Sequence, residues 1–304
     1  MTAAPAVAVV GEALVDLVPD STTYDVRPGG SPANTALALA RLGVPVAMVA
    51  RFGADEFGRL LRRHLAGSGV DLSLAVDAAE PSSVALVTKG IDGSADYRFL
   101  IDGTADWQWT ANELPELPPS VLAIHAGSLA LARAVALEPW LARRPDSVIL
   151  SLDPNLRRGL LPHDAPSLVD RWVRMSDIVK VSVDDLALLH PDEKPLIVAE
   201  RWAASGPALV VVTAGSDGAT AFFGDEVLHG DALHVDVVDT IAAGDAFTAG
   251  LLHQLHARDR LGEQFAKTDR ADIVAALETA TAVAGLTCKR AGADPPFLDD
   301  LPWR

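Results

Sequence analysis

The chain has 304 residues, 49% of them hydrophobic and 22% charged, which is typical of a globular protein. Its formal net charge of −16 argues against a nucleic-acid partner or an anionic membrane surface. Cys288 is the only cysteine, so no disulfide can form within the chain and a reducing cytoplasm is expected. The N-terminus lacks the basic region of a signal peptide. No apolar run approaches the roughly 20 residues that span a bilayer, so no membrane association is expected.

Short apolar runs alternate with helical stretches along the chain. The runs are uninterrupted, as in strands buried on both faces of a parallel sheet. They lie at 7–10, 46–49, 121–124, 148–150, 178–179 and 209–212. Helices are predicted at about 32–42, 55–66, 165–175, 183–190, 195–204, 244–257 and 271–287. This alternation predicts a doubly wound, mostly parallel α/β fold.

Two segments, about 13–27 and 83–109, break this rhythm. Each is rich in β-forming residues and glycine turns and contains no helical stretch of its own. We expect them to form a small sheet inserted in a single domain that spans 1–304. Irregular edge strands of the main sheet are the alternative. Trp107 and Trp109 fit a strand pattern that puts both on one face, where core packing or a dimer contact is favoured over a sugar platform.

The segment 238–252 carries the strongest chemical signal. Ala242, Ala243 and Gly244 open a predicted helix, and such small residues let the backbone amides approach a ligand. The first amides of a helix are unpaired and suit an anion. Asp245 beside that anion could take a proton from an attacking hydroxyl. An ordinary aspartate interacting with the helix dipole is the alternative.

A second segment, 27–36, joins a loop to a helix. Gly29 and Gly30 permit a tight turn there. Asn34 follows on the first helical turn, and its amide can donate and accept hydrogen bonds with neighbouring sugar hydroxyls. On its own, this junction could be purely structural.

A third segment, 213–218, follows the last apolar run. Such a turn lies at a strand's carboxyl end, where ligands of open α/β sheets bind. The sequence contains neither a Gly-x-x-x-x-Gly-Lys-Ser/Thr loop nor a Gly-x-Gly-x-x-Gly fingerprint, which disfavours a hydride-transfer enzyme. A plain β-turn remains the alternative for the isolated segment.

Together, the three segments resemble the PfkB/ribokinase family of carbohydrate and nucleoside kinases. The N-terminal family pattern runs from Gly29 through Asn34 to Gly53, and the C-terminal pattern from Asp239 to Leu252. The resemblance covers essentially the whole chain. It implies a ribokinase-like α/β core with a β-sheet lid, and ATP-dependent phosphorylation of a sugar hydroxyl.

The resemblance also implies roles for individual residues. Asp245 matches the general base, and Ala242, Ala243 and Gly244 match the anion hole for the transferring phosphoryl group. Asp16, Gly29, Gly30 and Asn34 match the sugar site. Thr213, Gly215 and Gly218 match the ATP turn, and Thr281 and Gly292 match the adenine pocket. Asp239 and the carbonyl of Ile241 match a monovalent-cation site, for which K⁺ is the expected ion.

One position departs from the family pattern. Many members carry Asn-x-x-Glu where this chain has Ser182 and Asp185. In the family these two side chains organise Mg²⁺ and phosphate through water. Serine keeps a hydrogen-bonding group and aspartate keeps the charge with a shorter reach, so the resemblance implies ATP and Mg²⁺ with an altered metal shell.

Segments 11–16 and 153–157 look most like the fructokinase and 2-keto-3-deoxygluconate kinase branch. There, Arg157 could reach substrate or phosphate, and a surface ion pair is the equal alternative. Arg98 could reach a substrate carboxylate from the lid, or face solvent. Fructokinase is the first expectation, followed by the keto-acid kinase and then ribokinase or a nucleoside kinase. A catalytically silent sugar or nucleotide sensor is the alternative of another class, and relatives imply a homodimer through the lid.

Overall fold

The computed structural model describes residues 3–89, 95–127, 129–160 and 162–302. Its strands are β1 (Val7–Val10), β2 (Leu14–Asp20), β3 (Thr23–Gly29), β4 (Val46–Val49), β5 (Arg51–Gly53), β6 (Val76–Ala78), β7 (Val84–Lys89), β8 (Ala95–Leu100), β9 (Ala123–Gly127), β10 (Ile149–Asp153), β11 (Ile178–Ser182), β12 (Leu209–Thr213), β13 (Ala219–Phe223) and β14 (Glu226–Gly230). Its α-helices are α1 (Ser31–Arg41), α2 (Glu56–Gly67), α3 (Leu129–Arg133), α4 (Leu137–Leu141), α5 (Ala165–Met175), α6 (Val183–Leu189), α7 (Pro195–Ala203), α8 (Ala243–Ala257) and α9 (Arg270–Cys288).

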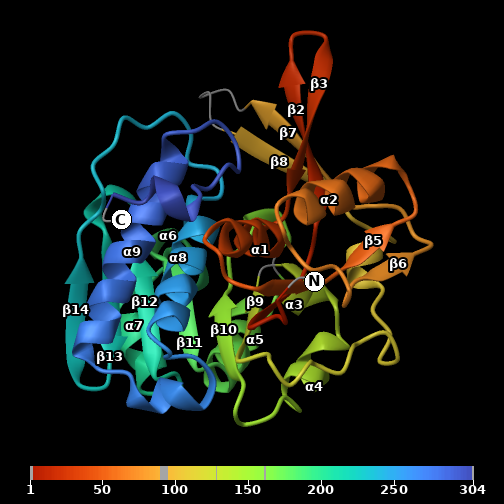
Figure 1. The fold of residues 1–304 in the computed structure, drawn as a ribbon. Helices are drawn as coiled ribbons and strands as arrows, with labels where there is room; N and C mark the ends of the chain where they lie inside the picture. Colours follow the sequence, from red (N-terminus) through yellow and green to blue (C-terminus); the bar gives the residue numbers. More distant parts are fainter. Residues whose placement is uncertain (1–2, 90–94, 128, 161, 303–304) are drawn as a thin grey trace.

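The main sheet has the order β14-β13-β12-β11-β10-β9-β1-β4 (Figure 1). The six strands from β12 to β4 are parallel, and β13 and β14 add an antiparallel edge. All six apolar runs therefore form the predicted strands. Several strands extend past their apolar run, because polar end residues still pair: Asp153 lies opposite Gly127, and Ser182 opposite Thr213.

Side chains along each core strand alternate between two hydrophobic clusters. On β1, Val7 and Val9 belong to the cluster built with α1, α2, α8 and α9. Ala8 and Val10 belong to the cluster that includes residues of α4, α5, α6 and α7. Burial on both faces explains the uninterrupted apolar runs, and it confirms the doubly wound arrangement.

Helices α8 and α9 lie side by side on one face of the sheet (Figure 1). A Cβ atom on Gly250 of α8 would lie 2.8 Å from the Cα of Ala280 on α9, so the glycine allows close helix packing. By length and composition alone, α9 is long and apolar enough to span a membrane. Of its most apolar stretch of 18 residues, 56% is buried within the molecule, as expected of a core helix.

The two irregular segments form a separate four-stranded sheet of order β3-β2-β7-β8, which we call the small sheet. Its β2–β3 hairpin projects beyond the body of the molecule (Figure 1). Residues 90–94, within the predicted second segment, lie outside the described residues. Strand β8 ends at Leu100, so the strand expected at Trp107 and Trp109 is wrong. Trp107 lies in a short 3₁₀ turn, and both rings are buried in the core.

The register of the small sheet gives its two faces distinct compositions. Leu17 pairs with Val26 and with Leu86, which in turn pairs with Arg98, so these side chains share one face. Asp16 is on the opposite face. That inner face is directed toward the carboxyl ends of the core strands, where the site described next is found.

Candidate active site

Two cavities meet where helix α8 begins. The first, of about 450 Å³, lies between the inner face of the small sheet and the carboxyl ends of β10 and β11. The second, of about 300 Å³, lies between the turn after β12 and helices α8 and α9. Both cavities are lined by Thr213, Thr240, Ala243 and Gly244. A group bound in one cavity can therefore approach a group bound in the other at the first turn of α8.

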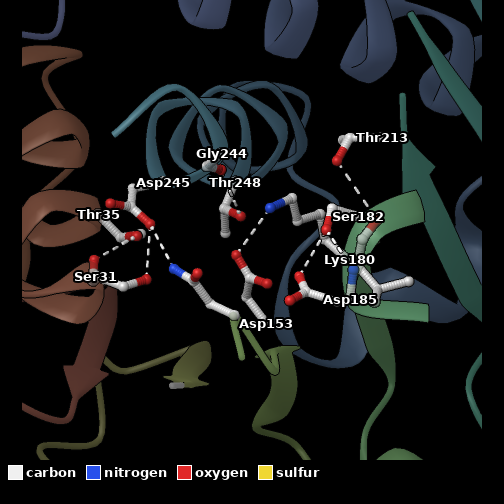
Figure 2. Close-up of polar contacts among 12 residues, drawn as sticks. Ser31, Thr35, Asp153, Lys180, Ser182, Asp185, Thr213, Gly244, Asp245 and Thr248 are labelled. Atoms are coloured by element: carbon white, nitrogen blue, oxygen red, sulfur yellow. Dashed lines mark hydrogen bonds and ion pairs between the residues drawn. The ribbon is translucent and has the colours of Figure 1, made fainter. Parts of the chain in front are cut away.

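Asp245 lies in the first cavity at this junction and is only 5% exposed. Ser31 donates a hydrogen bond to its Oδ1 at 2.6 Å (Figure 2), and Asn34 donates to its Oδ2 at 2.9 Å. Asn155 also donates to Oδ1, at 3.3 Å. Burial raises the pKa of Asp245, while the bonds from Ser31 and Asn34 partly oppose the rise. A buried carboxylate with a raised pKa is suited to accept a proton near neutral pH.

The backbone before α8 turns sharply at Ala242. This residue adopts a left-handed conformation with φ 60°, which costs a non-glycine residue roughly 1 kcal/mol. Within the described residues, no side chain caps the helix. The amide of Ala243 donates to the Thr240 carbonyl at 3.2 Å, and Ala243 lines both cavities. This bond lies within the turn that precedes α8, and the next residue, Gly244, lies at the junction of the two cavities.

The residues of the predicted sugar site converge on the first cavity. Asp16, Gly30 and Asn34 line it. Gly29 does not; a Cβ atom there would lie 2.4 Å from Oδ2 of Asp16, so this glycine makes room for the carboxylate. Burial raises the pKa of Asp16 to about 6, against the opposing charges of Arg157 and Arg27.

The two predicted arginines have different positions. Arg157 lines the first cavity and donates to Oδ1 of Asn155 at 2.6 Å. Arg98 is exposed and, among the described residues, is not part of the cavity lining. Its neighbours Tyr97 and Phe99 line the cavity instead, with ring centroids 6.0 Å apart. Strand alternation thus directs Arg98 to the outer face of the small sheet.

The predicted nucleotide residues gather around the second cavity. Thr213, Gly215, Gly218 and Thr281 line it, together with apolar residues of α8 and α9. Both glycines have positive φ values, 56° and 79°. A Cβ atom on Gly218 would lie 2.2 Å from the Gly230 carbonyl oxygen, so close packing requires this glycine.

Buried charges line the floor of the first cavity. Ser182 caps α6 and donates to Asp185 Oδ2 at 2.7 Å. Lys180 pairs with Asp153, with 2.9 Å between Nζ and Oδ2 (Figure 2). Burial would lower the pKa of Lys180, but the adjacent carboxylates, Asp153 first, raise it above its usual value. Lys180 is therefore a cation at neutral pH.

Asp239 connects two loops beside the site. Its Oδ1 accepts a hydrogen bond from the Ile241 amide at 3.1 Å, and its Oδ2 accepts one from the Gly292 amide at 2.8 Å. Gly292 therefore lies at the Asp239 loop and, among the described residues, outside the lining of the cavity that holds Thr281, so its adenine role stays a prediction.

Sequence reasoning missed several polar residues of the first cavity or its floor, and four of them form the bonds described above. Ser31 and Asn155 bind Asp245, and Lys180 pairs with Asp153. Ser31 lies inside the Gly29–Asn34 junction, and Asp153 and Asn155 lie inside the segment that drew attention to Arg157. Lys180, a single charge in an apolar strand, was a visible signal.

Comparison with known proteins agrees with this geometry. Residues 4–300 match the pfkB family carbohydrate kinase model. A fructokinase of Rhizobium leguminosarum bv. trifolii is 38% identical over 256 residues, covering 81% of this chain and 78% of that protein.

Two solved structures share the fold. Aminoimidazole riboside kinase of Salmonella enterica, complexed with aminoimidazole riboside and an ATP analogue, superposes with a TM-score of 0.81 at 29% identity, covering 97% of both chains. A fructokinase double mutant of Vibrio cholerae O395, bound to fructose, ADP and potassium, gives 0.84 at 28% identity, covering 96% of this chain and 95% of that one. The chain is a pfkB family carbohydrate kinase, an ATP-dependent enzyme with a ribokinase-type fold.

Proposed function

We propose that this enzyme is a fructokinase, which transfers the γ-phosphoryl group of ATP to a hydroxyl of D-fructose. The observation that carries the proposal is the position of Asp245, a buried carboxylate at the junction of a polar and a mainly apolar cavity. The polar cavity suits a small sugar, and the apolar one suits an adenine ring. The fructokinase relative and the fructose-bound structure support the choice of sugar.

In this mechanism Asp16, Gly30 and Asn34 hold the sugar hydroxyls, and Asp245 accepts the proton of the hydroxyl that attacks. Phosphoryl transfer depends mainly on positioning and charge stabilisation. Gly244, at the start of α8, places positive backbone charge at the cavity junction, where transfer would occur. The small sheet acts as a lid of a single kinase domain, excluding water and so limiting wasteful ATP hydrolysis.

We infer that Mg²⁺ accompanies ATP. Asp153 supplies a buried carboxylate and Asp185 a half-buried one near the junction, and in the described chain Oδ1 of Asp153 has no hydrogen-bond partner. The described residues contain no cluster of three or more His, Cys, Asp or Glu side chains that could hold a metal. Mg²⁺ would therefore take most of its ligands from phosphate and water, and would neutralise phosphate charge.

A monovalent cation, K⁺, is proposed at Asp239 and the Ile241 carbonyl. The related fructokinase structure contains potassium. The Asp239 carboxylate already fixes the loop leading into α8, so a cation there would act on the position of the helix start.

Two other substrates are worth testing. Arg157 lines the sugar cavity, where its charge would match the carboxylate of 2-keto-3-deoxygluconate. The likeness to aminoimidazole riboside kinase makes a riboside the second candidate. A silent sensor is disfavoured, because such a protein would not require a buried base at the junction of two cavities.

We propose further that the enzyme is a cytoplasmic homodimer whose lids face one another. Apolar side chains on the outer face of the small sheet, Val26, Leu100 and Tyr24 among them, are 44–53% exposed. The only cysteine, Cys288, fits a reducing compartment.

A coupled ADP-release assay tests the proposed substrate. D-fructose, 2-keto-3-deoxygluconate, ribose, tagatose, adenosine and aminoimidazole riboside are each supplied with ATP, Mg²⁺ and K⁺. We expect D-fructose to give the highest kcat/KM. If no compound raises ATP consumption above background, the sensor would replace the kinase proposal; a higher kcat/KM with another sugar would move the substrate assignment to it.

A further inference from the structure

Lys180 is a buried ammonium directed at the catalytic cavity. It lies on β11, is only 4% exposed, and lines the first cavity with Asp245 and Gly244. Lysine is almost never buried unless its charge is paired. Here the pair is with Asp153, at 2.9 Å.

The ammonium lies directly beside the first turn of α8. A Cβ atom on Gly244 would lie 2.8 Å from Nζ of Lys180, and among the described residues no other side chain, its two chain neighbours aside, would come within 4 Å of that Cβ atom. Figure 2 shows the Lys180 side chain extending from β11 toward Gly244. Since Gly244 lines both cavities, Nζ lies beside the junction where the two cavities meet.

Lys180 could instead serve only to neutralise Asp153, but two observations disfavour this. An ammonium has three N–H donors, and in the described chain Asp153 is the one hydrogen-bond acceptor found for it. Asp153 is not fully satisfied either, because among the described residues its buried Oδ1 has no hydrogen-bond partner. A closed structural salt bridge would satisfy both groups.

The surrounding charge points the same way. Asp153, Asp185 and Asp245 raise the pKa of Lys180, so all three are near it. The side chains of Ser182 and Asp185, which replace the family's Asn-x-x-Glu, bond to each other. Without Lys180, the site would present three carboxylates to a triphosphate, and repulsion would oppose transfer.

We propose that Lys180 is a catalytic residue that donates hydrogen bonds to the oxygens of the transferring phosphoryl group. The inference rests on the proposed kinase function. A bond forms between the sugar oxygen and the γ-phosphorus, and the bond from that phosphorus to the β,γ-bridging oxygen breaks. The hydroxyl proton passes to Asp245, ADP leaves, and Lys180 keeps its protons throughout.

The test compares Lys180→Met, Asp153→Asn and the double variant with wild type, and Lys267→Met serves as an exposed control. Turnover is measured by ADP release. Binding of ADP alone is compared with binding of ADP plus aluminium fluoride and sugar, a mimic of the phosphoryl group in transfer. ADP alone ends at the β-phosphate, so it should not reach Lys180.

Loss of Lys180 should lower kcat by about 100-fold to 1,000-fold, as loss of one oxyanion donor does. Binding of ADP with aluminium fluoride should weaken by about the same factor, and binding of ADP alone should change little. The double variant should show the same losses relative to Asp153→Asn. This second comparison decides the matter if Lys180→Met does not fold because Asp153 is left unpaired.

A double variant within about fivefold of Asp153→Asn in both readouts would overturn the proposal, leaving Lys180 as a counter-ion of Asp153. Wild-type turnover on D-fructose reports separately on the sugar assignment. If fructose fails, the variants are compared on the sugar that wild type does phosphorylate, so the two failures remain distinct.

Discussion

Three side chains from two distant segments hold the Asp245 carboxylate in place. Ser31 and Asn34 come from the start of α1, and Asn155 comes from the segment after β10. A base held this way needs no rearrangement before it accepts a proton. The Asn155 contact, at 3.3 Å, is the longest of the three, and is therefore the one most easily exchanged for a sugar hydroxyl.

Asp16 should make sugar binding depend on pH. Burial raises its pKa to about 6, so the carboxylate is present above that pH and becomes protonated below it. A carboxylate accepts stronger hydrogen bonds from hydroxyls than a carboxylic acid does. We therefore expect the KM for fructose to rise as the pH falls from 7.5 through about 6, measured by initial rates at saturating ATP.

Asp16→Asn provides the control. The amide keeps the shape but never ionises, so the KM for fructose should be about 10-fold to 100-fold higher at neutral pH and should lose its dependence on pH. A fructose KM in wild type that stays constant from pH 7.5 to about 5.5 would contradict a binding role for this carboxylate.

At the scale of elements, the contact between α8 and α9 fixes the helix that carries Asp245. Gly250→Ala places a Cβ atom 2.8 Å from the Cα of Ala280 and 3.2 Å from the Thr279 carbonyl oxygen. Alanine has the higher helix propensity, by about 1 kcal/mol, but backbone cannot yield as a flexible side chain does. We expect a net destabilisation of about 1–3 kcal/mol, measured by urea unfolding.

Gly67→Ala is the matched control for that substitution. Gly67 is the last residue of α2, and a Cβ atom there meets nothing within 4 Å. Its replacement should leave stability unchanged or raise it by up to about 1 kcal/mol. Equal effects of the two substitutions would show that close packing at Gly250 does not limit stability.

Most elements could be predicted because their signal is local. The apolar runs at Val7–Val10 and Leu209–Val212 form strands since both faces are buried, which the sequence displays directly. Trp107 could not be placed, because tertiary burial held it in a 3₁₀ turn where alternation suggested a strand. Helix α9 shows a second limit of local signals: its length and apolar composition alone do not distinguish a core helix from a membrane span.

The site was predictable only in part. Family motifs located Asp245, Asp16 and Asn34, but the bond from Ser31 joins residues 214 positions apart, and no periodicity reveals such a contact. The direction of Arg98 depended on the register of β7 and β8, which one residue of slip would reverse. The bond from the Gly292 amide to the Asp239 carboxylate joins residues 53 positions apart, and no local pattern reveals it either.

At the scale of the whole molecule, the outer face of the small sheet is the surface that the proposed dimer would cover. Val26 and Leu100 are exposed apolar residues on this face. Introducing a charge should prevent apolar burial there, so V26D and L100D should convert a dimer to a monomer in light scattering after size exclusion.

Val227→Asp is the control for that experiment. Val227 is 64% exposed on β14, at the opposite edge of the main sheet from β4, and outside the small sheet. This variant should keep the wild-type mass. A wild-type protein that is monomeric at micromolar concentration would remove the proposed interface.

The most direct measurement is turnover of Asp245→Asn on D-fructose, with ATP and Mg²⁺ present. The amide preserves shape but cannot accept the proton, so kcat should fall by about 1,000-fold or more, with the folded state and ADP binding retained. Folding is checked by the thermal midpoint and ADP binding by calorimetry. A folded variant that turns over within about tenfold of wild type would remove Asp245 as the base.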